Sequence, residues 1–189
     1  TERRLEPNLP AVRIGVPMGG VAMGDAPMRD ALHGGPHIVV RRSGLHGKGV
    51  FARRAIRRGE TIIEYKGERV DEAEIARRYP ENRNGLNHTF VFGLSEDLNI
   101  DGGVQGNSAR FINHACEPNC DTFEHKLRVY VRAARDIVAG EELFFDYAIQ
   151  AGEPLTRQLK ACWPCWCGSQ HCRGTVLLPS PRRRARRTP

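Results

Sequence analysis

Residues that could do chemistry are concentrated between positions 106 and 120 of the chain. Asn113 carries an amide donor and an amide acceptor, and the adjacent His114 presents two different ring nitrogens, so the pair can bind a polar ligand through side chains and backbone together. Cys116 follows as a candidate metal ligand. Because this mixture of polar groups ends in the turn signal Glu117-Pro118-Asn119, it is a poor design for an ordinary strand or helix. The stretch is therefore predicted to specify a site.

A second cluster lies near the other end of the chain and consists of three cysteines in a Cys-x-Cys-x4-Cys pattern: Cys165, Cys167 and Cys172. Structural zinc is held by four ligands in a closed tetrahedron, so a fourth ligand at Cys116 would clamp the C-terminal segment onto the middle of the chain. His171 is an alternative ligand. Cys120 and Cys162 are expected to be reduced spare thiols.

The six cysteines could instead form a disulfide framework in a secreted protein. Four of them crowd between positions 162 and 172, with spacings that suit metal ligation better. The sequence shows neither an apolar run of membrane-spanning length nor a basic region followed by an apolar stretch at its N-terminus. We therefore expect a reducing, intracellular environment with bound zinc, and no membrane partner.

The net charge of +7 is located mainly in the C-terminal tail. Residues 179–189 contain five arginines and no acid, whereas residues 37–178 carry a net charge of only about +2. The tail could contact nucleic acid or chromatin through phosphate charge, or act as a nuclear-localisation signal, or remain a solvated disordered segment. A chain of 189 residues is long enough for one domain with flanking tails.

The elements expected to position these residues are mostly short strands. Residues 1–36 contain glycine pairs and five prolines without a sustained period, which predicts a flexible leader, with an ordered arm as the alternative. Asp71 followed by Glu74 predicts the start of a helix that ends near Tyr79 before Pro80. β-Branched and aromatic runs between turn signals predict strands near 37–41, 61–68, 89–92, 98–100, 127–131 and 142–145. This pattern indicates a mostly β domain made of several small sheets.

Glycines bracket a loop at residues 44–49, before an apolar strand. Because glycine lets a backbone approach a ligand closely and adopt positive φ, Gly47-Lys48-Gly49 could cradle a cofactor, although such glycines more often simply make turns. The third glycine, the following helix and the βαβ context of a dinucleotide fold are missing.

Four stretches and the cysteine tail now stand in a fixed order: the loop at 44–51, Glu64-Tyr65-Lys66-Gly67-Glu68, residues 110–120, Glu141-Glu142-Leu143-Phe144-Phe145-Asp146-Tyr147, and Cys165 to Cys172. Together they resemble a SET-domain protein lysine methyltransferase with a post-SET zinc segment, and the small bacterial members in particular. The resemblance implies a SET fold with a knot-like threading over residues 37–150, a post-SET segment over 151–178 and an Arg-rich tail over 179–189.

The resemblance also implies the site residues. S-adenosyl-L-methionine would lie against Gly47, Lys48, Gly49, Arg110, Asn113 and His114. Tyr147 would be the catalytic tyrosine, beside the Asn-His stretch, with Tyr65 as a channel wall or, alternatively, only a core residue. Phe145 takes a position where the family carries Phe or Tyr, and Phe there leaves room for di- or trimethylation.

The family's post-SET arrangement assigns zinc to Cys116, Cys165, Cys167 and Cys172. Trp166, inside the cluster, would pack near the adenine or be a partly exposed aromatic. One departure is Ala115, where the family usually has serine, which removes a supporting hydrogen bond.

The resemblance predicts methyl transfer from S-adenosyl-L-methionine to a lysine of a histone or another DNA-bound basic protein, by a monomer. The alternative is a zinc-stabilised binding module that keeps the fold but has lost transfer. Localisation would be cytoplasmic in a bacterium and nuclear or chromosomal in, or directed at, a eukaryotic cell.

Overall fold

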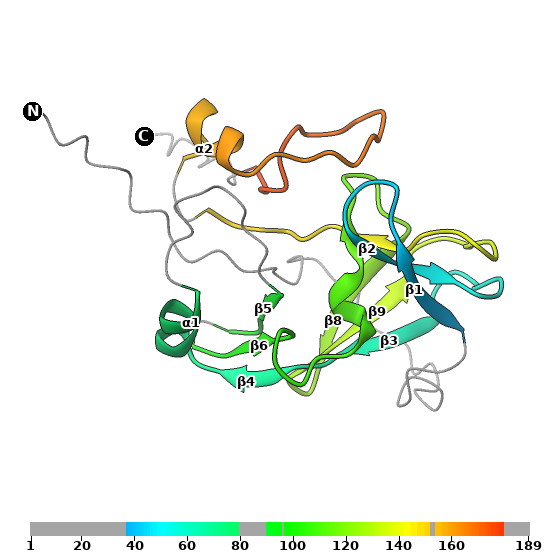
Figure 1. The fold of residues 1–189 in the computed structure, drawn as a ribbon, viewed down its shortest axis with the longest axis horizontal. Coiled ribbons are helices and arrows are strands. Elements are labelled where there is room, and N and C mark those ends of the chain that lie inside the picture. Colours follow the sequence, from blue (N-terminus) through cyan, green and yellow to red (C-terminus); the bar gives the residue numbers. More distant parts are fainter. Residues whose placement is uncertain (1–36, 80–89, 96, 152–153, 180–189) are drawn as a thin grey trace, which may run out of the picture.

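The computed structural model describes residues 37–79, 90–95, 97–151 and 154–179 (Figure 1). The predicted leader and almost all of the Arg-rich tail lie outside these residues, as does Pro80. The elements, in chain order, are β1 (Ile38–Arg42), β2 (Lys48–Ala52), β3 (Thr61–Tyr65), β4 (Glu68–Val70), α1 (Glu72–Arg78), β5 (Val91–Gly93), β6 (Asn99–Asp101), the 3-10 helix η2 (Ser108–Phe111), β7 (Asn113–His114), β8 (Cys120–His125), β9 (Arg128–Ala133), β10 (Phe144–Phe145) and α2 (Arg157–Cys162).

The strands form several small sheets, as the sequence predicts. β1 and β2 make an antiparallel hairpin, β3-β9-β8 and β4-β6-β5 are three-stranded antiparallel sheets, and β10 pairs with β7 in parallel. Figure 1 shows the β3-β9-β8 and β1-β2 sheets at one end of the molecule, the β4-β6-β5 sheet with α1 at the other, and the tail with α2 above. The mostly β fold is confirmed.

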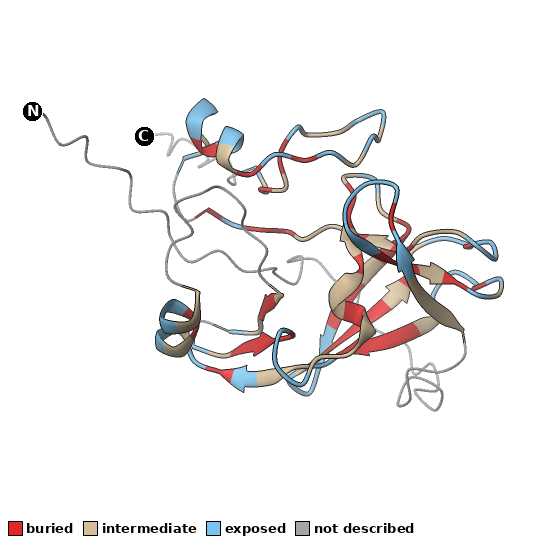
Figure 2. Cartoon of the chain, viewed as in Figure 1, coloured by how far each residue is buried: buried red, intermediate tan, exposed pale blue. Residues whose placement is uncertain are grey.

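The main core lies between these sheets. It takes apolar side chains from β2, β3, β9, η2 and β10, and its largest fully buried members include Tyr65, Phe92 and Phe145. In Figure 2 the buried colour follows the middle of β3 and β9 and fades at the connecting loops. The two loops after β2 and β9 are joined by paired backbone hydrogen bonds between Ile56 and Ile137. A rigid scaffold therefore supports the short strands β7 and β10.

Helix α1 follows its sequence signals closely. The Asp71 side chain accepts a hydrogen bond from the backbone N–H of Glu74, which satisfies one of the unpaired donors of the first turn. Ile75 is buried, and Tyr79 at the C-terminal cap packs beside it. The predicted helix over 71–79 is confirmed as Glu72–Arg78 with its two caps.

Two strands predicted from the sequence differ from the structure. The strand expected over 61–68 divides into β3 and β4, and at Gly67 an added Cβ would lie 2.3 Å from the Asp101 carbonyl oxygen, so the two segments meet too closely for a side chain. The strand expected over 142–145 keeps only Phe144–Phe145, because Glu142 and Leu143 pair with β2 instead.

Strand β8 and helix α2 were not predicted. Helix α2 is capped by Thr156, whose hydroxyl accepts from the Leu159 backbone N–H. Because the helix has only six residues, its sequence pattern is too short to predict it. Strand β8 alternates polar and apolar residues only in part and owes its place to six-residue pairing with β9.

Candidate functional site

The site is built on the parallel pair of β7 and β10. Their register places Asn113 opposite Phe144 and His114 opposite Phe145. Parallel strands require a long connection, and here residues 115–143 supply it through β8 and β9. Two stretches that the sequence separates by about thirty residues are thereby brought side by side, as expected for the Asn-His stretch and Tyr147.

Asn113 is oriented by the glycine loop. Its Nδ2 donates to the Lys48 carbonyl oxygen at 3.1 Å and to Glu142 Oε1 at 3.0 Å, with the His46 carbonyl at 3.4 Å. Because an amide nitrogen carries only two hydrogens, these acceptors fix the donor side of the amide against the loop. The amide oxygen is thus presented on the opposite side, where it can accept a hydrogen bond from a bound amine.

Glu142 ties the glycine loop to β7. Its Oε2 accepts from the Ser43 hydroxyl at 3.0 Å, while its Oε1 accepts from Asn113. A Cβ at Gly49 would lie 2.1 Å from Glu142 Oε1, so the carboxylate occupies the space that any other residue would need. Gly47 adopts φ +48°, which glycine tolerates without strain. The loop thus presents backbone carbonyl groups, those of His46 and Lys48, to Asn113.

Tyr147 is held at both ends. Its hydroxyl donates to the Ile112 carbonyl oxygen at 3.1 Å, and its backbone N–H donates to His114 Nδ1 at 3.1 Å. The ring packs against Phe145 and His114, with centroids 5.3 Å away in both cases. Loss of hydration raises the pKa of the phenol, so Tyr147 remains an uncharged donor at neutral pH.

His114 is a neutral imidazole in this environment. Burial lowers its pKa to about 4, although the Asp146 carboxylate acts in the opposite direction. Because Nδ1 accepts from the Tyr147 N–H, the ring proton must lie on Nε2, which is 3.4 Å from Cys116 Sγ. A single ring therefore contacts both the tyrosine and the cysteine cluster.

Asp146 receives an arginine from the C-terminal segment. Arg173 donates twice to its carboxylate, from Nη1 at 2.6 Å and from Nη2 at 2.9 Å, the planar paired geometry that arginine favours with carboxylates. Burial acts to raise the pKa of Asp146, but hydrogen bonding from Arg173 outweighs it and the pKa is lowered. Asp146 also accepts from the Ala148 N–H at 3.0 Å, so the peptide around Tyr147 is braced on both sides.

Tyr65 lies in the core beneath this site. It is 2% exposed, and its hydroxyl donates to the Phe90 carbonyl oxygen at 2.7 Å. Its ring packs on Phe92, which in turn packs on Phe145 at 6.3 Å between centroids. Burial raises its pKa strongly, so it too is a neutral phenol. These contacts connect Tyr65 to the site through Phe145, and its role as a channel wall stays a prediction.

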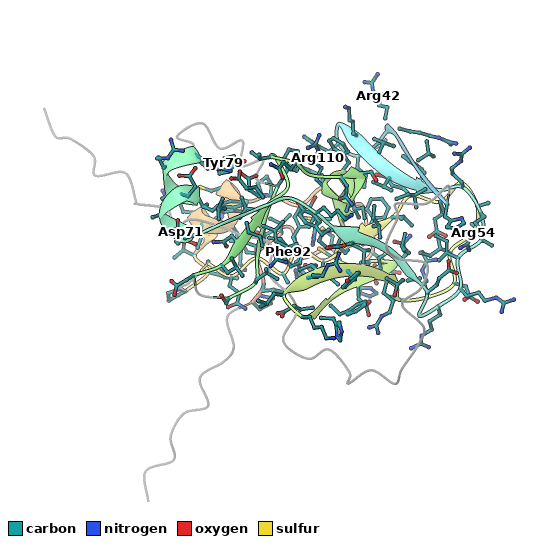
Figure 3. The ribbon with its side chains drawn as sticks, turned by 90° about the horizontal axis from the view of Figure 1, so that it is seen from below. Arg42, Arg54, Asp71, Tyr79, Phe92 and Arg110 are labelled. Atoms are coloured by element: carbon teal, nitrogen blue, oxygen red, sulfur yellow. The ribbon has the colours of Figure 1, made fainter. Side chains whose placement is uncertain are left out.

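Lys48 and Arg110 flank one aromatic ring. The Lys48 Nζ lies 4.9 Å and the Arg110 Cζ 4.7 Å from the centroid of Phe111, and Arg110 also donates to the Gly102 carbonyl oxygen at 3.0 Å. Figure 3 shows Arg110 over η2, close to the β4-β6-β5 half of the molecule. Two positive charges therefore stand beside the glycine loop, where an anionic group could bind.

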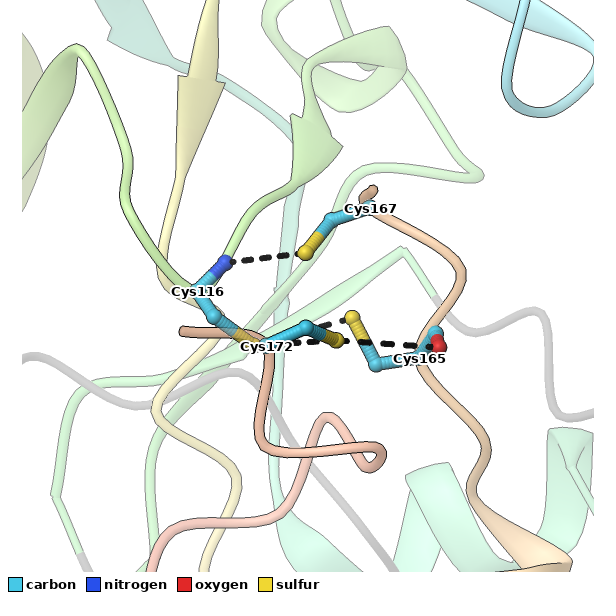
Figure 4. Close-up of side chains that lie close together, drawn as sticks. All are labelled: Cys116, Cys165, Cys167 and Cys172. Carbon is cyan, nitrogen blue, oxygen red and sulfur yellow. Dashed lines mark hydrogen bonds between the residues drawn. The ribbon is translucent and has the colours of Figure 1, made fainter. Parts of the chain in front are cut away.

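The four predicted cysteine ligands come together (Figure 4). The Sγ atoms of Cys116, Cys165, Cys167 and Cys172 all lie within 4.8 Å of one another. The sulfur of Cys116 is 3.7 Å from that of Cys165 and 4.0 Å from that of Cys172. Zinc–sulfur bonds of about 2.3 Å in a tetrahedron require sulfurs about 3.8 Å apart. The spacing therefore fits a tetrahedral metal ion.

The hydrogen bonds around the cluster also suit metal-bound thiolates. Backbone N–H groups of Cys116, Arg173 and Gly174 point at Cys167, Cys116 and Cys172 sulfurs respectively, at 3.3 to 3.5 Å. Burial would raise the pKa of the Cys167 thiol, yet the Cys116 N–H and the Ser169 groups lower it to about 6. Donors directed at sulfur favour the deprotonated form that a metal needs.

The remaining candidates in this segment lie apart from the four sulfurs. Cys120 is fully buried in the main core, and burial raises its pKa to about 12. Cys162 belongs to the small cluster under α2. His171 pairs through Nδ1 with Glu117 at 2.7 Å instead. Trp166 is 76% exposed, so any contact with an adenine would require a bound ligand to cover it.

Sequence reasoning missed three residues that the site uses: Glu142, Asp146 and Arg173. Each acts through a partner far away in the sequence, and no local spacing reveals it. Asp146 and Arg173 could have been noticed because each directly follows or precedes a predicted site residue.

Residues 47–148, more than half of the chain, match the SET domain family. The chain therefore belongs to the SET domain family. Neither helix in the described part of the chain is long and apolar enough to cross a bilayer.

The relatives are named as histone-lysine methyltransferases. Histone-lysine N-methyltransferase trithorax of Drosophila melanogaster is 38% identical over 144 residues, covering 72% of this chain and 4% of that protein. The H3 lysine-4 specific histone-lysine N-methyltransferase of Saccharomyces cerevisiae is 38% identical over 144 residues, covering 72% and 13%. The probable histone-lysine N-methyltransferase set-23 of Caenorhabditis elegans is 40% identical over 137 residues, covering 67% and 54%.

Solved structures agree with this assignment. ctPRC2 in an autoinhibited conformation, bound to S-adenosylmethionine, superposes with a TM-score of 0.55 at 36% identity, over 58% of this chain and 15% of that one. A humanized mutant of the Chaetomium thermophilum Polycomb Repressive Complex 2 bound to an inhibitor gives 0.51 at 40% identity, over 58% and 14%. This chain spans only a small part of most of these relatives. They are eukaryotic where an organism is named, so the resemblance to small bacterial members stays a prediction.

Proposed function

We propose that this chain is an S-adenosyl-L-methionine-dependent protein-lysine N-methyltransferase. The observation that carries the proposal is the fixation of Tyr147. Its hydroxyl is bound to the Ile112 carbonyl, its backbone to His114, and its ring lies on Phe145, so all the groups needed to orient an amine meet at one point. These contacts hold the phenol ring and its backbone in one orientation.

The residues around Asn113 suit the cofactor. Its outward amide oxygen can accept from an ammonium group, the Gly47-Lys48-Gly49 backbone leaves room for close approach, and Lys48 and Arg110 can balance a carboxylate. S-adenosyl-L-methionine supplies an electrophilic methyl group on a positively charged sulfur. Binding of this compound by a structural neighbour supports the same role for these residues here.

The protein's own contribution to the reaction is desolvation and alignment. Phe145 and Tyr147 provide an apolar surface on which a lysine side chain loses hydration, which lowers its pKa and favours the neutral amine with a free lone pair. The Tyr147 hydroxyl and the Ile112 carbonyl then direct that amine toward the methyl carbon, so that orientation is established before the reaction. Because Phe145 carries no hydroxyl to hold a water, a methylated amine can turn and react again, which predicts di- or trimethylation.

The substrate class follows from the relatives, whose names specify histone lysines. We propose a lysine in a histone or another basic protein as the acceptor, and an intracellular place of action. Several acids of the described residues pair with arginines: Glu64 with Arg128, Glu74 with Arg77 and Arg78, and Asp146 with Arg173. Glu142 in the site already accepts from Ser43 and Asn113. Sequence selection therefore depends on backbone and shape more than on free carboxylates.

The test is transfer from labelled S-adenosyl-L-methionine to core histones, with products read by mass spectrometry. Tyr147→Phe should lower the turnover by about a hundredfold or more, since it removes an orienting hydroxyl. Tyr130→Phe, in the stacked pair with Phe123 on β8 and β9, is the matched control and should keep normal turnover. Measurable cofactor binding without transfer to any basic substrate would instead favour the binding module.

A further inference from the structure

The domain is nearly neutral as a whole, but its basic and acidic residues lie in different parts of the sequence. Residues 37–59 contain seven arginines and lysines and not one aspartate or glutamate. These residues form the β1-β2 hairpin and the loop that follows it. Residues 60–178 carry more acids than bases, so the two nearly cancel when summed. A positive region therefore belongs to the folded domain as well as to the tail.

Five arginines of this region have no carboxylate partner among the described residues, and we call them the arginine surface: Arg41, Arg42, Arg53, Arg57 and Arg58. All five are exposed. Most other described arginines pair with an acid, namely those at 54, 77, 78, 128, 132, 135 and 173. Arg69 and Arg110 donate to backbone carbonyls instead. Two acids approach the surface, and each accepts from a backbone N–H rather than from one of its guanidinium groups: Glu60 accepts from Arg57, and Asp136 from Arg58.

The hairpin separates these charges along its length. Arg42 ends β1 opposite Lys48, whereas the Arg53 N–H bonds to the His37 carbonyl at the other end of the same hairpin. Five residues of strand separate the two ends, a length of about 16 Å. Figure 3 shows Arg42 extending away from the hairpin into solvent. Arg57 and Arg58 continue the series in the loop after β2, which the Ile56 and Ile137 bridge holds in place.

A group of exposed arginines without carboxylate partners, on a rigid support, suits a phosphate backbone. Arginine binds phosphate with two parallel hydrogen bonds, and successive phosphates of one strand rise by about 3.4 Å along a duplex. No Phe, Tyr or Trp is among the exposed large apolar side chains of this hairpin and loop, so base stacking of the kind used for single strands is not provided. We propose that the arginine surface docks the domain on the phosphate backbone of duplex DNA.

The test is binding of a short DNA duplex to the full chain, measured by fluorescence anisotropy at several salt concentrations. The triple variant Arg42→Gln, Arg57→Gln, Arg58→Gln should weaken binding at least about tenfold. It should also reduce the slope of log affinity against log salt by about 2.7, which corresponds to three phosphate contacts. Neither measurement needs cofactor or a lysine substrate. A negative result for DNA binding can therefore be distinguished from a negative result for the proposed methyl transfer.

The matched control removes the same charge elsewhere. Lys126→Gln, Arg157→Gln, Lys160→Gln replaces three exposed basic residues in the β8-β9 turn and on α2. This control should keep wild-type affinity within about twofold, and both variants should keep the wild-type unfolding midpoint. Equal weakening by both triple variants would show that only net charge matters and would overturn the proposal. Binding to anionic lipid vesicles without measurable duplex binding would overturn it as well.

Discussion

The two sides of the site are held in different ways. On one side, the glycine loop, Asn113 and Glu142 are joined by hydrogen bonds between elements that share the main core. On the other side, Asp146 and His114 face the C-terminal segment, which brings Arg173 and three cysteines. That segment has only a small core of its own, formed around Leu159, Trp163 and Leu177.

The two sides are therefore stabilised by different contributions to the free energy of folding. Burial of a large apolar core stabilises the glycine-loop side regardless of any ion. The tail side buries few apolar residues, so metal coordination must contribute much of the free energy that holds it in place. Tyr147 lies between the two sides and needs both.

The largest effect is expected from loss of the metal site. Cys172→Ser removes one of four ligands, so the tail should detach and transfer should fall by about a hundredfold or more. The stability of the main core, measured by hydrogen exchange of the β3 and β9 amides, should change little. Cys162→Ser, on α2 and away from the four sulfurs, is the control and should retain metal, measured by elemental analysis, and activity.

Substitution of Arg173 tests its contact with Asp146 while the metal site is kept. Arg173→Met should lower turnover by about tenfold while metal content stays normal, because Asp146 loses its paired donors. Arg173→Lys should recover only part of this loss, since an ammonium cannot reproduce the paired geometry. Arg132→Met breaks a similar pair with Asp121 on β8 and β9 and should leave turnover unchanged. Equal losses from the two methionine variants would contradict a positioning role.

On the glycine-loop side, Glu142→Gln should weaken cofactor binding by about tenfold, measured by calorimetry, with turnover at saturation nearly kept. The amide can keep one acceptor for Asn113 or for Ser43 but cannot serve both as the carboxylate does. The neighbouring Glu141→Gln acts on Arg135 and Asn119 and should leave cofactor affinity unchanged.

The smallest effect on rate, with a change in product, is expected for Phe145→Tyr. The added hydroxyl can hold a water beside the amine, so products should shift toward monomethyl-lysine with a change in the first turnover of about threefold or less. Phe144→Tyr, on the adjacent position of β10, should leave the product distribution as it was. Unchanged methylation states in both variants would remove Phe145 as the determinant.

The sequence predicted helix α1 and most of the strands because the signals for these elements lie within a few residues of one another. Asp71 with Glu74 fixes the start of α1 through one side-chain hydrogen bond, which needs no distant partner. Strand β8 and the division at Gly67 depend on contacts with β9 and with Asp101, and these contacts are invisible to a short window. The Cys165 to Cys172 spacing predicted a metal cluster, and the four sulfurs do converge.

The sequence by itself determined the residue types and the order of the motifs, because thiols, amides and glycines carry their chemistry and conformational freedom wherever they stand. It was enough to predict the mostly β SET fold. Only the tertiary structure decided that Glu142 orients Asn113, that Arg173 braces Asp146, and that five arginines of the acid-free stretch 37–59 stay exposed. Pairing and charge compensation depend on distances between residues far apart in the chain, and folding alone sets those distances.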